Sequence, residues 1–401
     1  MVKQSKLINL NIIYLIMKAI HYSKIIFLLT VILFVFVSSC DKTEDEPAGP
    51  PSLSHVTTIK DVETIISGGN MGDWIAIHGK NLKSTYEIFF NDVEVNMEEV
   101  YYENEVLYLQ VPIKIPLDVT DKLTVITMGG EITYDFVVGV PDLELTYMFN
   151  EYTFPGDTIK IYGRFLDLYE VDSDNTVVIF GDIQTPVIDN GSTFITAKVP
   201  VNVQPNVKVK AVNSKYDATA VCPGFYQDKH NVITTFDDDF PHGSVGATWA
   251  SVVELFYDDD PTKPASSGNC LKFFVNEGNA PTGLGWWYMM ENSYDYSQDM
   301  IDNRENYVLK FELRMGSPIR TTNFFIYNRW NNDNPLPVLS GETFSVQENN
   351  QWQTISVPFE ALYLPTHEYP PSNLNFRVEN FAPVEPVNMF FDNFRMYKKG
   401  E

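Results

Sequence analysis

Aromatic side chains are concentrated in one short segment of the C-terminal half of the chain. Trp286, Trp287 and Tyr288 follow one another within residues 281–290, which carry no charged side chain, and a second cluster ends in Arg329 and Trp330. A flat apolar ring beside hydrogen-bonding groups suits a pyranose sugar, which has C–H bonds on its faces and hydroxyls at its edge. The sequence therefore predicts a carbohydrate-binding surface here. The alternative is that these rings fill the core of a β-sandwich.

Strands are the elements expected to position these rings. In residues 307–314 apolar side chains alternate with Val308, Lys310, Glu312 and Arg314, and a period of two is typical of a strand with one face toward a core. Residues 374–379 alternate in the same way. We expect the sandwich to expose at least one such polar face as a hydrogen-bonding surface, where sugar hydroxyls accept from Arg314, Asn328, Arg329 and Arg377. The alternative is a face that is only solvated.

The conformation of the aromatic triplet decides how many of its rings can reach one ligand. If residues 285–288 are extended, Trp286 and Tyr288 share a face and Trp287 lies on the other. Gly283 and Gly285 favour a loop or a bent strand, which would let all three rings splay toward the sugar. Trp352 stands directly before a predicted strand and is expected to be structural.

An internal repeat precedes this region. Residues 72–82 read GDWIAIHGKNL and residues 156–166 read GDTIKIYGRFL. In both copies isoleucines alternate with other residues, as in a half-buried strand, and the following glycine permits a tight turn. The spacing fits one small sandwich per copy, and the pattern resembles the IPT/TIG immunoglobulin-like (Ig-like) family. Trp74, His78 and Tyr162 are expected to be packing or surface residues.

The N-terminus carries a predicted export signal. Lys18 and Lys24 precede an apolar run at residues 25–37, and small residues then lead to Cys40. This order is typical of a secretory signal peptide, and the run is short for a transmembrane helix. Val-Ser-Ser-Cys resembles a bacterial lipobox, which implies cleavage before Cys40 and its acylation, and several acyl chains give stable anchoring. The alternative is an ordinary signal peptide with a chance cysteine.

The formal net charge of −25 restricts the partners of the chain. Such a surface repels phosphates, so we expect no nucleic acid partner, whereas a neutral ligand would be indifferent to the charge. The remaining cysteines, Cys222 and Cys270, are assigned to different domains, so two separately buried thiols are favoured over a disulfide.

The predicted fold class is all-β, with two tandem IPT/TIG sandwiches followed by a jelly-roll β-sandwich. The predicted order is a lipoprotein signal peptide (1–39), an acidic proline-containing tether (40–54), two Ig-like domains (55–140 and 141–228) and a carbohydrate-binding β-sandwich (229–401).

The order of these features resembles the surface glycan-binding lipoproteins of Bacteroidetes, of the second type found in Sus-like polysaccharide utilisation loci. The acidic residues after Cys40 resemble the surface-export signal of such lipoproteins. The resemblance implies an anchor in the outer membrane at the cell surface, a TonB-dependent transporter and a companion glycan-binding protein as partners, and a plant β-glucan such as xyloglucan as ligand. It supports Trp286, Trp287, Tyr288 and Trp330 as ligand-binding residues.

Other function classes leave weaker signals. A glycosidase needs two carboxylates across one cleft, and no acidic residue near the aromatics lies in a recognisable catalytic motif. We therefore expect no enzyme activity and no cofactor. A protein-adhesion module is the serious alternative, with the aromatics as an interface hot spot. Asp237, Asp238, Asp239 and Asp392 would meet where the first and last strands pair, so a structural Ca²⁺ there is a further alternative.

Overall fold

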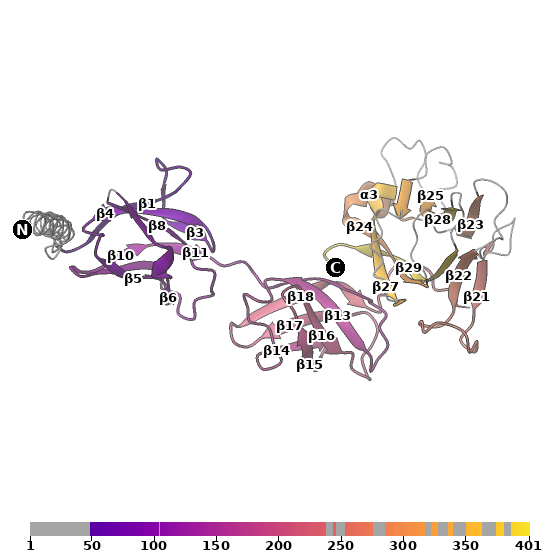
Figure 1. Cartoon of the computed structure of the whole chain (residues 1–401). Coiled ribbons are helices and arrows are strands. Elements are labelled where there is room, and N and C mark those ends of the chain that lie inside the picture. Colours follow the sequence, from indigo (N-terminus) through magenta and orange to yellow (C-terminus); the bar gives the residue numbers. More distant parts are fainter. Residues whose placement is uncertain are drawn as a thin grey trace, which may run out of the picture. The chain divides into compact units, whose positions relative to one another are not determined.

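The computed structural model describes residues 49–103, 105–237, 244–245, 253–275, 285–292, 294, 296–316, 322–327, 336–339, 350–362, 374–380 and 386–401 (Figure 1). Only the backbone is described for residues 244–245, 285–292, 322–327, 336–339, 362 and 374–380. Within all these residues, no helix is both long enough and apolar enough to cross a membrane.

The chain divides into two compact units. The first comprises Met1–Gly68, Asp73–Val111 and Thr120–Val137, and the second comprises Gly69–Gly72, Pro112–Val119 and Val138–Glu401. The second unit therefore contains both the second Ig-like repeat and the C-terminal sandwich. The domain boundaries assigned from the sequence stay a prediction.

Two sheets form the first Ig-like sandwich, drawn in indigo and purple in Figure 1. Their strand orders are β2-β1-β4-β8-β7 and β10-β9-β5-β6, and Ile75, Ile77 and Phe90 are buried between them. The elements of this part of the chain are β1 (Ser52–Thr58), β2 (Ile65–Ile66), β3 (Gly68–Asn70), β4 (Trp74–Lys80), β5 (Thr85–Phe90), β6 (Val93–Glu94), η1 (Met97–Glu99), β7 (Tyr101–Glu103), β8 (Val106–Gln110), β9 (Lys122–Thr127), β10 (Gly130–Asp135) and β11 (Val137–Gly139).

The second Ig-like repeat forms a sheet in the order β12-β13-β16-β15-β14-β17-β18 around a core that includes Ile159, Ile161 and Phe180. Its strands are β12 (Glu144–Met148), β13 (Thr158–Arg164), β14 (Thr176–Phe180), β15 (Ile183–Asn190), β16 (Phe194–Lys198), β17 (Val207–Asn213) and β18 (Ala218–Tyr226).

The repeated motif has the same structure in both copies. β4 and β13 pair antiparallel with the first strand of their domain, and each pairing contains a register shift. A Cβ added at Gly79 would lie 2.1 Å from the carbonyl oxygen of Ser52, and one at Gly163 would lie 2.4 Å from that of Glu144. The glycines are therefore required for close backbone approach rather than for the tight turn predicted from the sequence.

The aromatic residues beside the repeat form cross-strand pairs. His78 stacks on His55 at 4.3 Å between ring centroids, and Tyr162 stacks on Tyr147 at 4.6 Å. Trp74 is exposed on the sheet of the first domain. All three are packing or surface residues, as predicted.

The C-terminal part is a two-layered sandwich. One layer has the order β21-β22-β29-β24-β27, with β19 paired to β29, and the other has the order β20-β23-β28-β25-β26. The predicted pairing of the first and last strands is confirmed. The elements are β19 (Val232–Thr234), β20 (Ser244–Val245), β21 (Val253–Phe256), β22 (Cys270–Val275), β23 (Gly285–Asn292), α2 (Gln298–Asp302), η2 (Arg304–Asn306), β24 (Tyr307–Met315), β25 (Thr322–Tyr327), β26 (Leu336–Leu339), β27 (Gln353–Pro358), α3 (Phe359–Leu362), β28 (Leu374–Asn380) and β29 (Val387–Lys398).

The polar face of β24 is largely buried, so it is not the exposed hydrogen-bonding face that one of the two polar strands was predicted to provide. Lys310 and Glu312 are only 7% and 2% exposed. The segment after β12 covers them: Glu151 accepts hydrogen bonds from Lys310 and, at 2.6 Å, from Arg395 of the last strand. Glu312 accepts from Arg395 at 2.8 Å, and Thr354 donates its backbone N–H to Phe149 at 2.8 Å. The second Ig-like repeat and the sandwich thus share a buried charge cluster.

Charge balance within this cluster explains how its carboxyl groups ionise. Burial favours the neutral carboxyl, but Lys310 and Arg395 hold the pKa of Glu151 below its usual value. Burial raises the pKa of Glu312 to about 7, and burial together with the charge of Glu312 raises the pKa of Asp392 well above its usual value.

We expect Glu151→Ala to destabilise the second unit by about 3–5 kcal/mol, because the change leaves Lys310 and Arg395 buried without their shared anion. Glu144→Ala is the matched control: Glu144 lies in the same repeat, and its pair with Arg164, at 3.5 Å, is exposed, so its loss should cost less than about 1 kcal/mol. Urea unfolding followed by tryptophan fluorescence measures both changes. Equal midpoints for the two variants would contradict the cluster's proposed role.

We expect the free energy of unfolding to fall as the pH rises from about 5 to about 8. The folded chain holds a proton on Glu312 up to a pKa of about 7, whereas the unfolded chain releases it near 4.5. This stabilisation is complete below the unfolded pKa and is lost as the pH rises through the folded one. Urea unfolding at a series of pH values measures the slope. Glu312→Gln, which cannot titrate, should flatten it, and an unchanged slope would refute the assignment.

Candidate functional site

The predicted aromatic segment forms β23, which lies between β20 and β28 in the five-stranded sheet of the sandwich. β23 pairs antiparallel with β28, and β28 pairs on its other side with β25. Residues 285–288 are therefore extended, and the loop that would have splayed all three rings is not formed. Strand alternation then decides which residues share a face.

Register places aromatic and polar residues together on one face of this sheet. Trp286 lies opposite Glu379, and Tyr288 lies opposite Arg377. On the far side of β28, Phe325 also lies opposite Arg377. Directly opposite residues of an antiparallel pair share a face, so these five positions belong to one surface. Asn323 lies opposite Glu379 and belongs to the same surface. We call this face, at residues 286, 288, 323, 325, 377 and 379, the aromatic platform.

The other face of the same sheet has an apolar pattern. Trp287 and Phe324 lie opposite Val378, and Met290 and Ile326 lie opposite Phe376. An antiparallel sheet with one apolar and one mixed face is typical of a sandwich wall with its apolar face toward the core. The pattern therefore predicts a core position for Trp287, whereas Trp286 and Tyr288 stay predicted ligand-binding residues.

The remaining predicted site residues are not brought to this platform within the described part of the chain. Arg314 lies in β24, which belongs to the six-stranded sheet, and its Nε donates to the Asn350 Oδ1 at 2.9 Å. Arg329, Trp330 and Cys40 lie outside the described residues, so their predicted roles in sugar binding and lipidation stay predictions.

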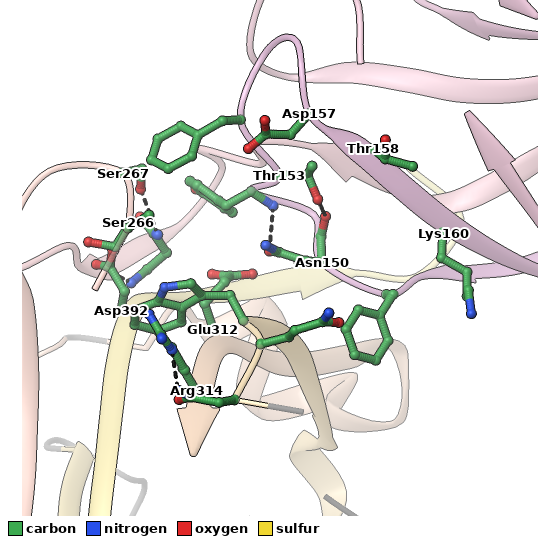
Figure 2. Close-up of a pocket in the computed structure, with 18 of the residues that line it drawn as sticks. Asn150, Thr153, Asp157, Thr158, Lys160, Ser266, Ser267, Glu312, Arg314 and Asp392 are labelled. Carbon is green, nitrogen blue, oxygen red and sulfur yellow. Dashed lines mark hydrogen bonds between the residues drawn. The ribbon is translucent and has the colours of Figure 1, made fainter. Parts of the chain in front are cut away.

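Arg314 instead lines a cleft of about 570 Å³ within the second unit (Figure 2). One wall comes from residues 149–160 of the Ig-like repeat, and the other from segments of the sandwich that include Arg314 and Trp352. Sequence reasoning missed this cleft, because its walls come from segments far apart in the chain and no single motif marks it. Trp352, predicted to be structural, packs on Phe390 and also lines the cleft.

The two cysteines and Asp392 are reactive groups that the fold buries. Cys222 and Cys270 are free and buried, as predicted, and burial raises the pKa of each thiol to about 12. Asp392 is fully buried near Asp237, whose charge raises the pKa of Asp392 further. Among the described residues, no group of three or more His, Cys, Asp or Glu side chains could hold a metal ion. This finding does not test a Ca²⁺ site at the predicted aspartates, which stays a prediction.

Comparison with known proteins relates the chain to glycan-binding proteins. Residues 226–398 match the family model described as the surface glycan-binding protein B xyloglucan binding domain. The chain is also 25% identical over 194 residues to an IPT/TIG domain-containing protein of Bacteroides ovatus, which covers 47% of this chain. The chain covers 37% of the length of that curated relative.

Solved structures show the fold. The surface glycan-binding protein PbSGBP-B from Prevotella bryantii matches with a TM-score of 0.58 at 20% identity, over 88% of this chain and 100% of that one. SGBP-B from a complex xyloglucan utilization locus in Bacteroides uniformis matches with a TM-score of 0.48 at 18% identity, over 87% and 99% of the two chains. The likeness to the Prevotella protein confirms the predicted all-β fold of successive sandwiches.

The resemblance predicted from the sequence is therefore confirmed: the chain is similar to surface glycan-binding proteins of Bacteroidetes, and its residues 226–398 match the xyloglucan binding domain of that family.

Proposed function

We propose that this protein binds a polysaccharide at the cell surface without cleaving it, and that the ligand is a plant β-glucan such as xyloglucan. The observation that carries the proposal is the register of the five-stranded sheet, which places Trp286 and Tyr288 on one face with Arg377 and Glu379. This face belongs to the part of the chain that matches a xyloglucan binding domain.

The platform offers the two kinds of contact that a β-glucan chain needs. The rings of Trp286 and Tyr288 would stack on the C–H faces of successive pyranose units. Arg377 and Glu379 would exchange hydrogen bonds with the equatorial hydroxyls, as donor and acceptor. A neutral glucan pays no electrostatic penalty for approaching a chain of net charge −25.

The acidic residues of the platform favour binding over hydrolysis. Glu379 and Glu291 occupy the same face by register, because Glu291 lies opposite Asn375. Their positions are separated by four residues along β28, about 13 Å at 3.3 Å per residue. Glycosidases of both stereochemical classes place their two carboxyl groups within about 9.5 Å. The two backbone positions are thus farther apart than the two carboxyl groups of a glycosidase.

Anchoring would turn weak single contacts into retention. Acylation of Cys40 would confine the protein to the outer membrane at the cell surface, and residues 40–54 would tether it. Many copies facing one repeating polymer would then hold it by avidity. A TonB-dependent transporter and a companion glycan-binding protein are the proposed partners that receive the bound glycan.

We expect Trp286→Ala and Tyr288→Ala each to weaken xyloglucan binding about tenfold, equivalent to about 1.4 kcal/mol per lost ring. Affinity electrophoresis of the full chain in gels with and without xyloglucan measures retention. Trp74→Ala, which removes an exposed indole from the first Ig-like domain, is the matched control and should bind normally.

Two results would count against the proposal. If no polysaccharide of a panel retards the unaltered protein, the protein-adhesion alternative is favoured. Alternatively, release of reducing sugar during the assay would indicate an enzyme.

A further inference from the structure

The cleft beside Arg314 has the dimensions of a ligand site. Its volume of about 570 Å³ lies within the range of about 300–1,000 Å³ usual for small-molecule pockets. In Figure 2 the side chains of Asn150, Thr153 and Asp157 project from the Ig-like repeat, while those of Glu312 and Arg314 come from the sandwich. A ligand in this space would contact both parts of the second unit.

The two walls are held together by buried contacts, so the cleft is formed before any ligand arrives. The backbone N–H of Glu151 donates to the Thr354 hydroxyl at 2.8 Å, and that hydroxyl donates to Glu312 at 2.9 Å. The Glu151 carboxylate is bound by Arg395, which is fully buried. Binding to a preformed site avoids the entropic cost of ordering its walls.

Aromatic rings line this cleft on both sides. Phe154 and Tyr162 come from the Ig-like repeat, and Trp352 comes from the sandwich. The Trp352 ring meets the edge of Phe390 at 6.5 Å between centroids, and its Nε1 is buried without a hydrogen-bond partner within the described part of the chain. An unpaired buried donor is costly unless a ligand or water accepts its hydrogen.

Charged groups of both signs line the cleft. Asp157 and Lys160 lie on one wall, and Glu312, Arg314 and Asp392 lie on the other. Hydrogen-bond donors and acceptors therefore both face the cleft, and a neutral ligand with many hydroxyls, each of which can donate and accept, matches it. Asn350 accepts from the Arg314 Nε and so orients the guanidinium at the cleft.

From these observations we propose a second glycan-binding site in this cleft, which takes a short neutral oligosaccharide segment between Trp352 and Arg314 on one wall and Phe154 and Asp157 on the other. The proposal rests on the proposed function only in assuming that the ligand is a glycan. Arg314 then binds sugar, as its sequence predicted, but in the six-stranded sheet rather than on the platform. Two sites on one module would engage two segments of polymer and increase avidity.

Calorimetric titration of the full chain with a xyloglucan oligosaccharide and with cellohexaose tests the proposal. A platform variant, Trp286→Ala with Tyr288→Ala, should retain one weaker site per chain. Adding Arg314→Ala and Asp157→Ala, one change on each wall, should weaken that residual binding at least tenfold. Arg164→Ala, an exposed arginine of the same Ig-like repeat, is the matched control and should leave it unchanged.

Trp352→Phe provides a second test with little risk to folding, because it keeps an aromatic ring; it removes the Nε1 donor and part of the stacking surface, so it too should weaken the residual site. Urea midpoints equal to that of the unaltered protein would establish that each variant is folded. If the unaltered protein binds sugar and the platform variant binds none, the cleft proposal is overturned while the proposed function stands. Residual binding that is unchanged by Arg314→Ala with Asp157→Ala and by Trp352→Phe also overturns the cleft proposal. If the unaltered protein binds neither sugar, the proposed function itself fails.

Discussion

A buried guanidinium governs the architecture of the second unit. Arg395 lies in the last strand and has no exposed surface, so its charge must be compensated from within. One of its carboxyl partners, Glu312, belongs to its own sheet, but another, Glu151, comes from the Ig-like repeat. Separating the two parts would leave a charge unpaired in a low-dielectric interior. The sandwich therefore depends on the preceding repeat as a structural partner, beyond any role of that repeat as a spacer.

This contact restricts where a long polymer can lie. The Ig-like repeat covers the outer face of the six-stranded sheet at Lys310 and Glu312. Under the proposed function a long glycan therefore lies on the mixed face of the five-stranded sheet, whereas the proposed cleft site takes only a short segment.

Local patterns were enough to predict the strands, but not what covers them. Alternation in residues 307–314 predicted β24, and the repeated glycine motif predicted β4 and β13, because both signals lie within a few residues. The burial of Lys310 arises from Glu151, 159 residues away, and no local pattern distinguishes a lysine that faces water from one that faces a distant carboxylate. The platform was predicted in part: alternation separated Trp287 from its neighbours only once the segment was known to be extended.

The same short segment joins assembly to the cleft. Residues 149–157 supply Glu151 to the charge cluster and also Asn150, Phe154 and Asp157 to the cleft wall. Any loosening of the Glu151–Arg395 contact would therefore move that wall relative to Arg314 and Trp352, and would change the shape of the cleft. The platform lies in the other sheet and has no residue in this segment. Ligand binding in the cleft is therefore coupled to the contact between repeat and sandwich. A ligand that contacts both walls stabilises the arrangement in which the Glu151–Arg395 contact is formed, because it binds that arrangement.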